Sequence, residues 1–151
     1  MSVKEIDLDP DKKFGIGFPL NYDRESYGFF KQNSKYYDQI QDNIKNLIMT
    51  KIGERPGNVD FGCRIHEFIF EPNEPNILKS KCEEAIREAL STWLNHVKLL
   101  KLTASSEGNS LKLVGTFSSA FNNQIIAQTF YFNYAYEQSG IDPNEGSSDG
   151  Y

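Results

Sequence analysis

The order of the hydrophobic periodicities constrains this chain most. Two stretches, at about residues 35–51 and 75–94, repeat apolar residues every three or four positions, which is the pattern of an amphipathic helix. Three later stretches alternate apolar and polar residues as strands do, at about 97–104, 111–117 and 124–136. Helices followed by consecutive strands favour an α+β fold, with two main helices packed on a small antiparallel β-sheet that is a three-strand meander.

Each helical stretch places its apolar residues on one face. The stripe of the first consists of Tyr36, Tyr37, Ile40, Ile44, Leu47 and Ile48. Pro75 stands near the first turn of the second, whose stripe consists of Leu78, Cys82, Ala85, Ile86, Ala89, Leu90 and Trp93. A short helical turn is expected between the two, at about 65–70. These stripes predict the helical part of the core.

The length of 151 residues corresponds to one domain. We expect a single α+β domain over residues 14–137. Residues 1–13 alternate charges and include a proline, and they are predicted to be a flexible N-terminal arm. Residues 138–151 are polar and rich in Gly and Ser, and they are predicted to be a disordered acidic tail, so that both termini are flexible.

The negative charge is concentrated at one end. The net charge is −5, and Glu137, Asp142, Glu145 and Asp149 supply −4 of it without any Lys or Arg after residue 136. A nearly neutral body lacks the basic field that attracts phosphates, so neither a nucleic acid nor a membrane is expected as a partner. No apolar run is long enough to cross a bilayer, and the first residues lack the pattern of a secretory signal. Two cysteines without such a signal indicate synthesis in a reducing cytoplasm.

Cysteine and histidine offer two chemical hypotheses. Cys63 and His66 are a nucleophile and a base in principle, but they stand three positions apart and no orienting Asn or Asp is evident. The same pair has half of a zinc spacing, which Cys82 and His96 would have to complete from elsewhere in the chain. A buried thiol and a surface histidine explain these residues more simply. We therefore expect no cofactor, no metal and no catalytic residue.

Acidic residues near the central loop offer a third hypothesis. Glu54, Asp60, Glu67 and Glu71 could supply the two carboxylates that glycoside hydrolysis needs. Acidic residues are common, so salt bridges and helix-end charges are the favoured explanation of such a group.

The loop at residues 53–62 contains three glycines and one proline. Glu54 and Arg55 stand between Gly53 and the rigid unit Pro56-Gly57, and Arg55 could offer two hydrogen bonds to a carboxylate of a partner. The alternative is a plain connection between helices with an internal Glu54–Arg55 salt bridge. The residue pattern leaves both open.

The third predicted strand also has two interpretations. If this long apolar and aromatic strand lies at the edge of the sheet, its unpaired backbone groups can accept a strand from another chain. If it is central, its backbone is already paired. The sequence does not decide between the two.

Several segments resemble the gene-25-like baseplate wedge family of contractile phage tails, which has relatives in type VI secretion baseplates. The family pattern is an amphipathic helix that ends in Thr, then Gly-(Glu/Ser)-Arg and a spacer, then an aromatic residue and Gly. The matching segments are Thr50 to Cys63, Ile69-Phe70-Glu71, Ala85-Ile86-Arg87 and the upstream Phe18-Pro19. The resemblance covers about residues 14–136 in the same order.

One departure concerns the end of the second long helix. The family usually has Glu-Pro-Arg there, often after an aromatic residue, whereas here Trp93 is followed by Leu94-Asn95-His96. If the triplet docks these proteins onto the wedge, an apolar Leu94 and His96 replace an acid and a permanent cation.

The resemblance implies a structural component of a baseplate wedge, located in the tail baseplate of the virion and made in the host cytoplasm. Such proteins bind helical bundles of other wedge subunits and are thought to template the first ring of tail sheath subunits by accepting strands. For this chain it implies partner-binding residues at the loop, at the helix end and on the third strand: Glu54, Arg55, Pro56, Phe61, Gly62, Trp93, Leu94, His96, Thr129, Tyr131 and Asn133. Some members carry a lysozyme label, so a tail-associated peptidoglycan hydrolase is the alternative, with Glu54 and Glu71 as its candidate carboxylates.

Overall fold

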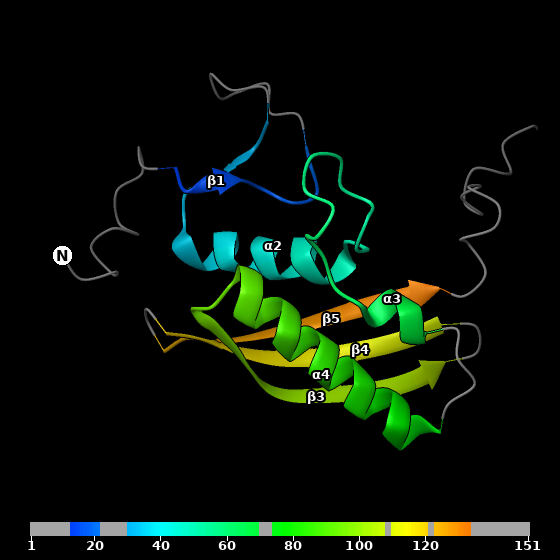
Figure 1. Ribbon diagram of the computed structural model, residues 1–151. Coiled ribbons are helices and arrows are strands. Elements are labelled where there is room, and N and C mark those ends of the chain that lie inside the picture. Colours follow the sequence, from blue (N-terminus) through cyan, green and yellow to red (C-terminus); the bar gives the residue numbers. More distant parts are fainter. Residues whose placement is uncertain (1–12, 22–29, 70–73, 108–109, 121–122, 134–151) are drawn as a thin grey trace, which may run out of the picture.

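The computed structural model describes residues 13–21, 30–69, 74–107, 110–120 and 123–133 (Figure 1). The predicted tail and all but the last residue of the predicted N-terminal arm lie outside these ranges. None of the helices within them is long and apolar enough to cross a membrane.

The two long helices form where the periodicity predicts them. Helix α2 spans Tyr36–Met49 and buries Ile40, Ile44, Leu47 and Ile48. Helix α4 spans Pro75–Trp93, and its proline stands in the first turn, where a missing N–H costs nothing. Its buried residues are Cys82, Ala85, Ile86, Ala89 and Leu90. Helix α3, Ile65–Phe68, is shorter than predicted.

The three predicted strands form one antiparallel sheet. Strands β3 (Val97–Glu107), β4 (Ser110–Ser119) and β5 (Ile125–Asn133) are ordered β3-β4-β5. β4 alternates between buried and half-buried residues along its whole length, because one face of the sheet meets the helices and the other does not. The predicted α+β class with a three-strand meander is therefore confirmed. Residues 134–136, which the sequence assigned to the third strand, lie outside the described part of the chain.

The core lies between the sheet and the helices, which cover the same face of it (Figure 1). Its largest fully buried side chains include Phe117 and Phe130, whose rings meet edge to face. The inward residues of β5 are Ile126, Phe130 and Phe132, as the alternation predicted. The outward residues of β5 are exposed.

A two-stranded sheet lies on the other side of α2. Strand β1 is Gly15–Ile16 and strand β2 is Gln32–Asn33. The amide nitrogen of buried Asn33 donates to the carboxylate of Asp42 on α2 at 2.6 Å, and the backbone N–H of Phe18 donates to the same carboxylate at 3.0 Å. This polar contact attaches the segment before α2 to the helix and keeps it beside the loop that follows α2.

Candidate functional site

The loop after α2 is held in shape by its own backbone. The N–H of Gly53 donates to the carbonyl of Val59 at 2.8 Å, and the N–H of Cys63 donates to the carbonyl of Thr50 at 2.9 Å. Gly53, Gly57 and Gly62 have φ values of +90°, +83° and +138°, a region that favours glycine. The preorganised loop that the sequence suggested is therefore present.

Glu54 and Arg55 point to different partners within this loop. The carboxylate of Glu54 accepts a hydrogen bond from the N–H of Lys51 at 3.1 Å. The guanidinium of Arg55 lies over the ring of Phe61, 4.7 Å from its centroid. Arg55 forms no ion pair with any residue that the structure describes, so the internal Glu54–Arg55 salt bridge is not formed.

Arg55, Phe61 and Trp93 form one stack, which we call the arginine stack. The rings of Phe61 and Trp93 meet edge to face with centroids 5.3 Å apart, so a residue of the loop rests on the last residue of α4. Arg55 is exposed at the outer end of this stack, while Phe61 and Trp93 are half-buried. Arg55 precedes α3 and Trp93 is the last residue of α4, so the two are far apart in the sequence, and the fold brings them together.

The remaining predicted residues of this surface differ in exposure. Pro56 is exposed at the loop tip, whereas Gly62 is buried against the backbone of Thr50. Leu94, just after the end of α4, packs against the core, and the carbonyl of His96 accepts a hydrogen bond from Ala120 at 2.8 Å. Gly62 is therefore placed to support the loop.

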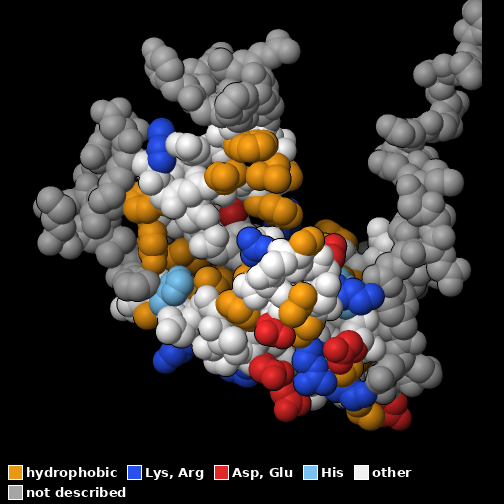
Figure 2. Space-filling model, turned by 45° about the horizontal axis from the view of Figure 1, so that its top comes forward, with side chains coloured by type: hydrophobic (Ala, Val, Ile, Leu, Met, Phe, Trp, Pro, Cys, Tyr) orange, Lys and Arg blue, Asp and Glu red, His pale blue; other side chains and the backbone are white. Residues whose placement is uncertain are grey.

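Two grooves flank the loop. One, of about 490 Å³, runs between β1 and α2 and reaches Glu54 and Arg55; exposed apolar side chains of Ile16, Phe18 and Leu20 line it. The other, of about 210 Å³, lies between the loop and α4 and ends at Trp93. Hydrophobic side chains gather at the surface on this side of the molecule (Figure 2). An exposed arginine such as Arg55 beside apolar side chains is typical of a protein-binding surface.

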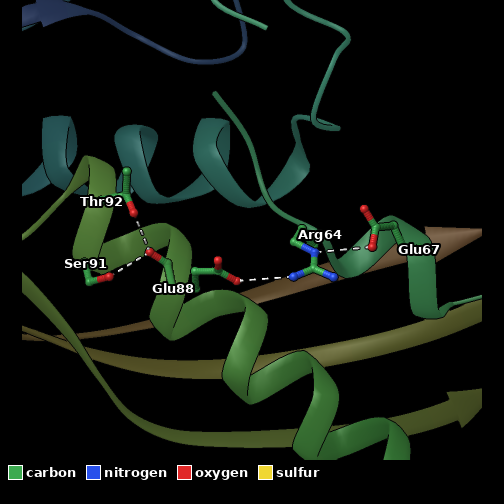
Figure 3. A network of polar contacts seen from close by, with 5 residues as sticks. All are labelled: Arg64, Glu67, Glu88, Ser91 and Thr92. Carbon is green, nitrogen blue, oxygen red and sulfur yellow. Dashed lines mark hydrogen bonds and ion pairs between the residues drawn. The ribbon is translucent and has the colours of Figure 1, made fainter. Parts of the chain in front are cut away.

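A polar network joins α3 to α4 below the loop (Figure 3). Arg64 contacts the carboxylate of Glu67 at 3.3 Å and that of Glu88 at 3.7 Å. The hydroxyls of Ser91 and Thr92 donate to the carbonyl of Glu88. Glu67 is thus a surface ion-pair partner, which is the simpler of the two interpretations of the acidic residues. Glu71 lies outside the described residues.

The cysteines do not have the environment of nucleophiles or metal ligands. Burial raises the pKa of both Cys63 and Cys82 to about 11, so the thiols stay protonated at neutral pH. The ring of His66 packs edge to face on Phe132, 5.3 Å away. No group of three or more His, Cys, Asp or Glu that could hold a metal occurs among the residues described, so the fold does not assemble the hypothesised zinc set. The interpretation of buried thiols is correct, whereas His66 is half-buried rather than a surface histidine.

Burial lowers the pKa of His96 below its ordinary value of 6.5. The unfolded chain therefore binds a proton at this position more readily than the folded protein does, and the folded state loses stability as the pH falls through 6.5. We expect the Tm to fall more between pH 7.5 and 5.5 in the wild type than in His96→Gln, which cannot titrate. Parallel Tm curves for the two proteins would contradict this environment of His96.

Strand β5 forms one edge of the described sheet. The N–H of Ser119 donates to the carbonyl of Gln124 at 3.2 Å, which makes this pair a hydrogen-bonded one. Because hydrogen-bonded and non-hydrogen-bonded pairs alternate along an antiparallel ladder, every second residue of β5 directs its N–H and C=O away from β4. These residues are Ile125, Ala127, Thr129, Tyr131 and Asn133.

The edge of β5 is also regular and uncharged. No charged residue and no register shift interrupts Ile125–Asn133, and Thr129, Tyr131 and Asn133 are exposed. Natural proteins usually protect an edge with charges, prolines or bulges, and none of these occurs along β5. Of the two interpretations of this strand, the edge position is the observed one, since β5 pairs only with β4 among the described strands.

Sequence reasoning did not anticipate two structural contacts. Arg87, on α4, donates to the backbone carbonyl of Leu99 on β3, and Asn33 anchors β2 to α2. The sequence signals for Arg87 were its place in the segment Ala85-Ile86-Arg87 and its i,i+4 spacing from Glu83, which predicts the ion pair that the structure forms but not the contact with β3.

Comparisons with known proteins agree with the fold. The chain matches the family described as baseplate wedge protein gp25 over residues 34–118. No curated protein matches it. A protein from Geobacter sulfurreducens, provisionally named a tail lysozyme, is 26% identical in its crystal structure; the match covers 63% of this chain and 87% of that one, with a TM-score of 0.56. The baseplate of the anti-feeding prophage contains a chain with a TM-score of 0.53 and 16% identity, matched over 82% of this chain and 86% of its own.

Proposed function

This chain belongs to the baseplate wedge protein gp25 family, and we propose that it docks on helical wedge subunits through its arginine stack and offers β5 to the tail sheath. It is a structural component of the baseplate of a contractile tail or a related assembly. Its partners in that assembly are other baseplate subunits. The docking surfaces and the sheath contact are our proposal.

The arginine stack is the observation that supports docking. Binding energy concentrates in aromatic and arginine side chains that a partner can desolvate. Arg55 is exposed, lies on Phe61 and Trp93, and has no carboxylate partner among the described residues. We assign the loop and helix-end residues to this interface, with Gly62 as its support: Glu54, Arg55, Pro56, Phe61, Gly62, Trp93, Leu94 and His96.

The partner of this surface is a helical bundle that carries a carboxylate opposite Arg55. The family's usual Glu-Pro-Arg triplet, which would carry a permanent cation at its last position, reads Leu94-Asn95-His96 here. Because burial lowers the pKa of His96, that histidine is neutral at pH 7. Arg55 is then an exposed cation of the arginine stack that can pair with an acidic partner residue.

Arg55→Ala should weaken docking far more than folding. The residue contributes one exposed cation–π contact, worth about 0.5–1 kcal/mol to stability. A desolvated arginine in an interface is worth about 2 kcal/mol or more, which is roughly a thirtyfold loss of affinity. The measurement is the amount of the variant that co-purifies with the wedge subunits, alongside its Tm.

Lys79→Ala is the control, because Lys79 is also an exposed cation but lines neither of the grooves beside the loop. It should leave co-purification intact. Equal losses of Tm and of docking in Arg55→Ala would make Arg55 a structural residue only, and the proposed docking surface would be wrong.

Strand addition at β5 is the second part of the proposal. The exposed, regular and uncharged edge at Thr129, Tyr131 and Asn133 supports it, since an extended segment can extend the sheet there by backbone hydrogen bonds. We propose that the segment comes from the tail sheath subunit, so that this protein templates the first sheath ring. A single baseplate wedge domain over 14–137, with a flexible arm at 1–13 and an acidic tail at 138–151, completes the proposal. Its location would be the tail baseplate of a virion, after synthesis in the host cytoplasm.

We further propose that the chain is not an enzyme, although one relative bears the name tail lysozyme. A glycosidase needs a carboxylic acid in an apolar setting and a second carboxylate across a sugar-binding cleft. Glu54 is exposed and accepts a backbone hydrogen bond, so it lacks that setting. Peptidoglycan hydrolysis that Glu54→Gln abolishes would overturn this part of the proposal.

A further inference from the structure

The two edges of the sheet differ in a way that the proposed function does not explain. β5 is regular and uncharged, whereas β3 carries a register shift between Leu99 and Lys101 and exposes Lys98 and Lys101. Leu100, at the shift, is 53% exposed. Bulges and lysines are devices that keep an edge strand from pairing with another chain.

Arg87 closes the same edge more directly. The pair His96–Ala120 is hydrogen-bonded, through the N–H of Ala120 and the carbonyl of His96. By the alternation of an antiparallel ladder, the C=O of Leu99 then points away from β4, toward the free side of β3. Nη1 of Arg87 donates to this oxygen at 3.2 Å, so the guanidinium occupies an acceptor that an added strand would need.

Glu83 holds the guanidinium in place. It lies one turn earlier on α4, and its carboxylate is 3.8 Å from Nη2 of Arg87. The arginine therefore spans from its own helix to the edge of the sheet, with a planar group that can serve both contacts at once. A lysine at this position has a single ammonium group and cannot reproduce this geometry.

We propose that Arg87 is the residue that closes the β3 edge, so that the sheet accepts one strand only, at β5. This inference rests on the proposed use of β5 as the acceptor. In a protein whose β5 edge is open, a closed β3 edge prevents the copies from pairing with one another. If both edges were open, β3 of one copy could pair with β5 of the next, and such a head-to-tail contact does not close and generates fibres.

The test uses the isolated chain and needs no sheath subunit. We expect the wild type to stay at one chain mass, 17.3 kDa, in sedimentation equilibrium. Arg87→Ala should self-associate, with the average mass rising at least about twofold as the protein concentration increases. Arg87→Lys should behave like Arg87→Ala if the geometry of the guanidinium matters. Lys79→Ala, which removes an exposed charge from the same helix, should stay monomeric.

A second variant separates this inference from the proposed function. Arg87→Ala combined with Thr129→Pro should be monomeric, because the proline blocks the β5 edge that the opened β3 edge would join. If the double variant still associates, β3 pairs with a second β3; closure by Arg87 then stands and the use of β5 fails. If folded Arg87→Ala has the same mass as the wild type at every concentration, the inference is wrong.

Discussion

Thr129→Pro should weaken the proposed binding of a sheath strand at β5 and leave the protein folded. The N–H of Thr129 points away from β4, so proline removes no hydrogen bond of the sheet and costs about 1 kcal/mol or less in stability. At the edge, the same change removes a donor and places a ring where the added strand must lie. We expect affinity for the sheath subunit to fall at least about tenfold, which corresponds to 1.4 kcal/mol.

Gln128→Pro is the matched control, one residue earlier on the same strand. Its N–H points toward Gly115 of β4, so proline there breaks the sheet from within and leaves a carbonyl unsatisfied, at a cost of about 1–3 kcal/mol. Urea unfolding and sheath binding should separate the two variants. If Thr129→Pro unfolds as readily as Gln128→Pro, then β5 is paired on both sides in solution and is not an open edge.

Gly62→Ala should destabilise the fold more than any other substitution in the loop. A Cβ at this position would lie 2.5 Å from the carbonyl oxygen of Thr50 and 3.1 Å from the N of Ile52, and φ is +138°. Both neighbours are backbone atoms, so neither can rotate away. Steric overlap and backbone strain together should lower the free energy of unfolding by about 2–4 kcal/mol.

Gly57→Ala provides the comparison, because its φ is +83° and nothing lies within 4 Å of the added Cβ. Only the conformational cost remains there, about 1 kcal/mol. Circular dichroism in increasing urea measures both. Equal losses in the two variants would mean that the close approach of Gly62 to Thr50 relaxes, and that the loop is not rigidly anchored at its end.

Much of the fold could be predicted from local patterns. The apolar stripe of α2 and the alternation of β4 identify buried residues correctly, because helix and strand periods determine which side chains share a face. Strand limits were less accurate: β3 extends to Glu107, beyond the predicted 104, since pairing with β4 continues where the sequence becomes polar.

The candidate site required tertiary information. The loop pattern predicted a rigid turn, but it left open whether Arg55 pairs with Glu54. The structure separates them because the loop directs Arg55 onto Phe61 and Glu54 onto the N–H of Lys51. Neither contact has a local sequence signal. The Glu54 contact depends on the geometry of the turn, and the Arg55 contact depends on where Trp93 holds the ring of Phe61.

The edges of the sheet could not be assigned from sequence either. The alternation of apolar and polar residues shows which side chains share a face of the sheet, but it does not show which strand lies in the middle. The role of Arg87 likewise depends on a carbonyl of β3 twelve residues away, in a register that no local pattern specifies.

Amide hydrogen exchange along β5 tests the central claim most directly. The account predicts that the N–H groups of Ala127, Thr129 and Tyr131 exchange quickly in the free protein, whereas Phe130 is protected by its bonds to β4. In a stoichiometric complex with the sheath subunit, the first three should become protected. If they still exchange quickly in that complex, no strand adds at β5, and the account of how this protein contacts the sheath is wrong.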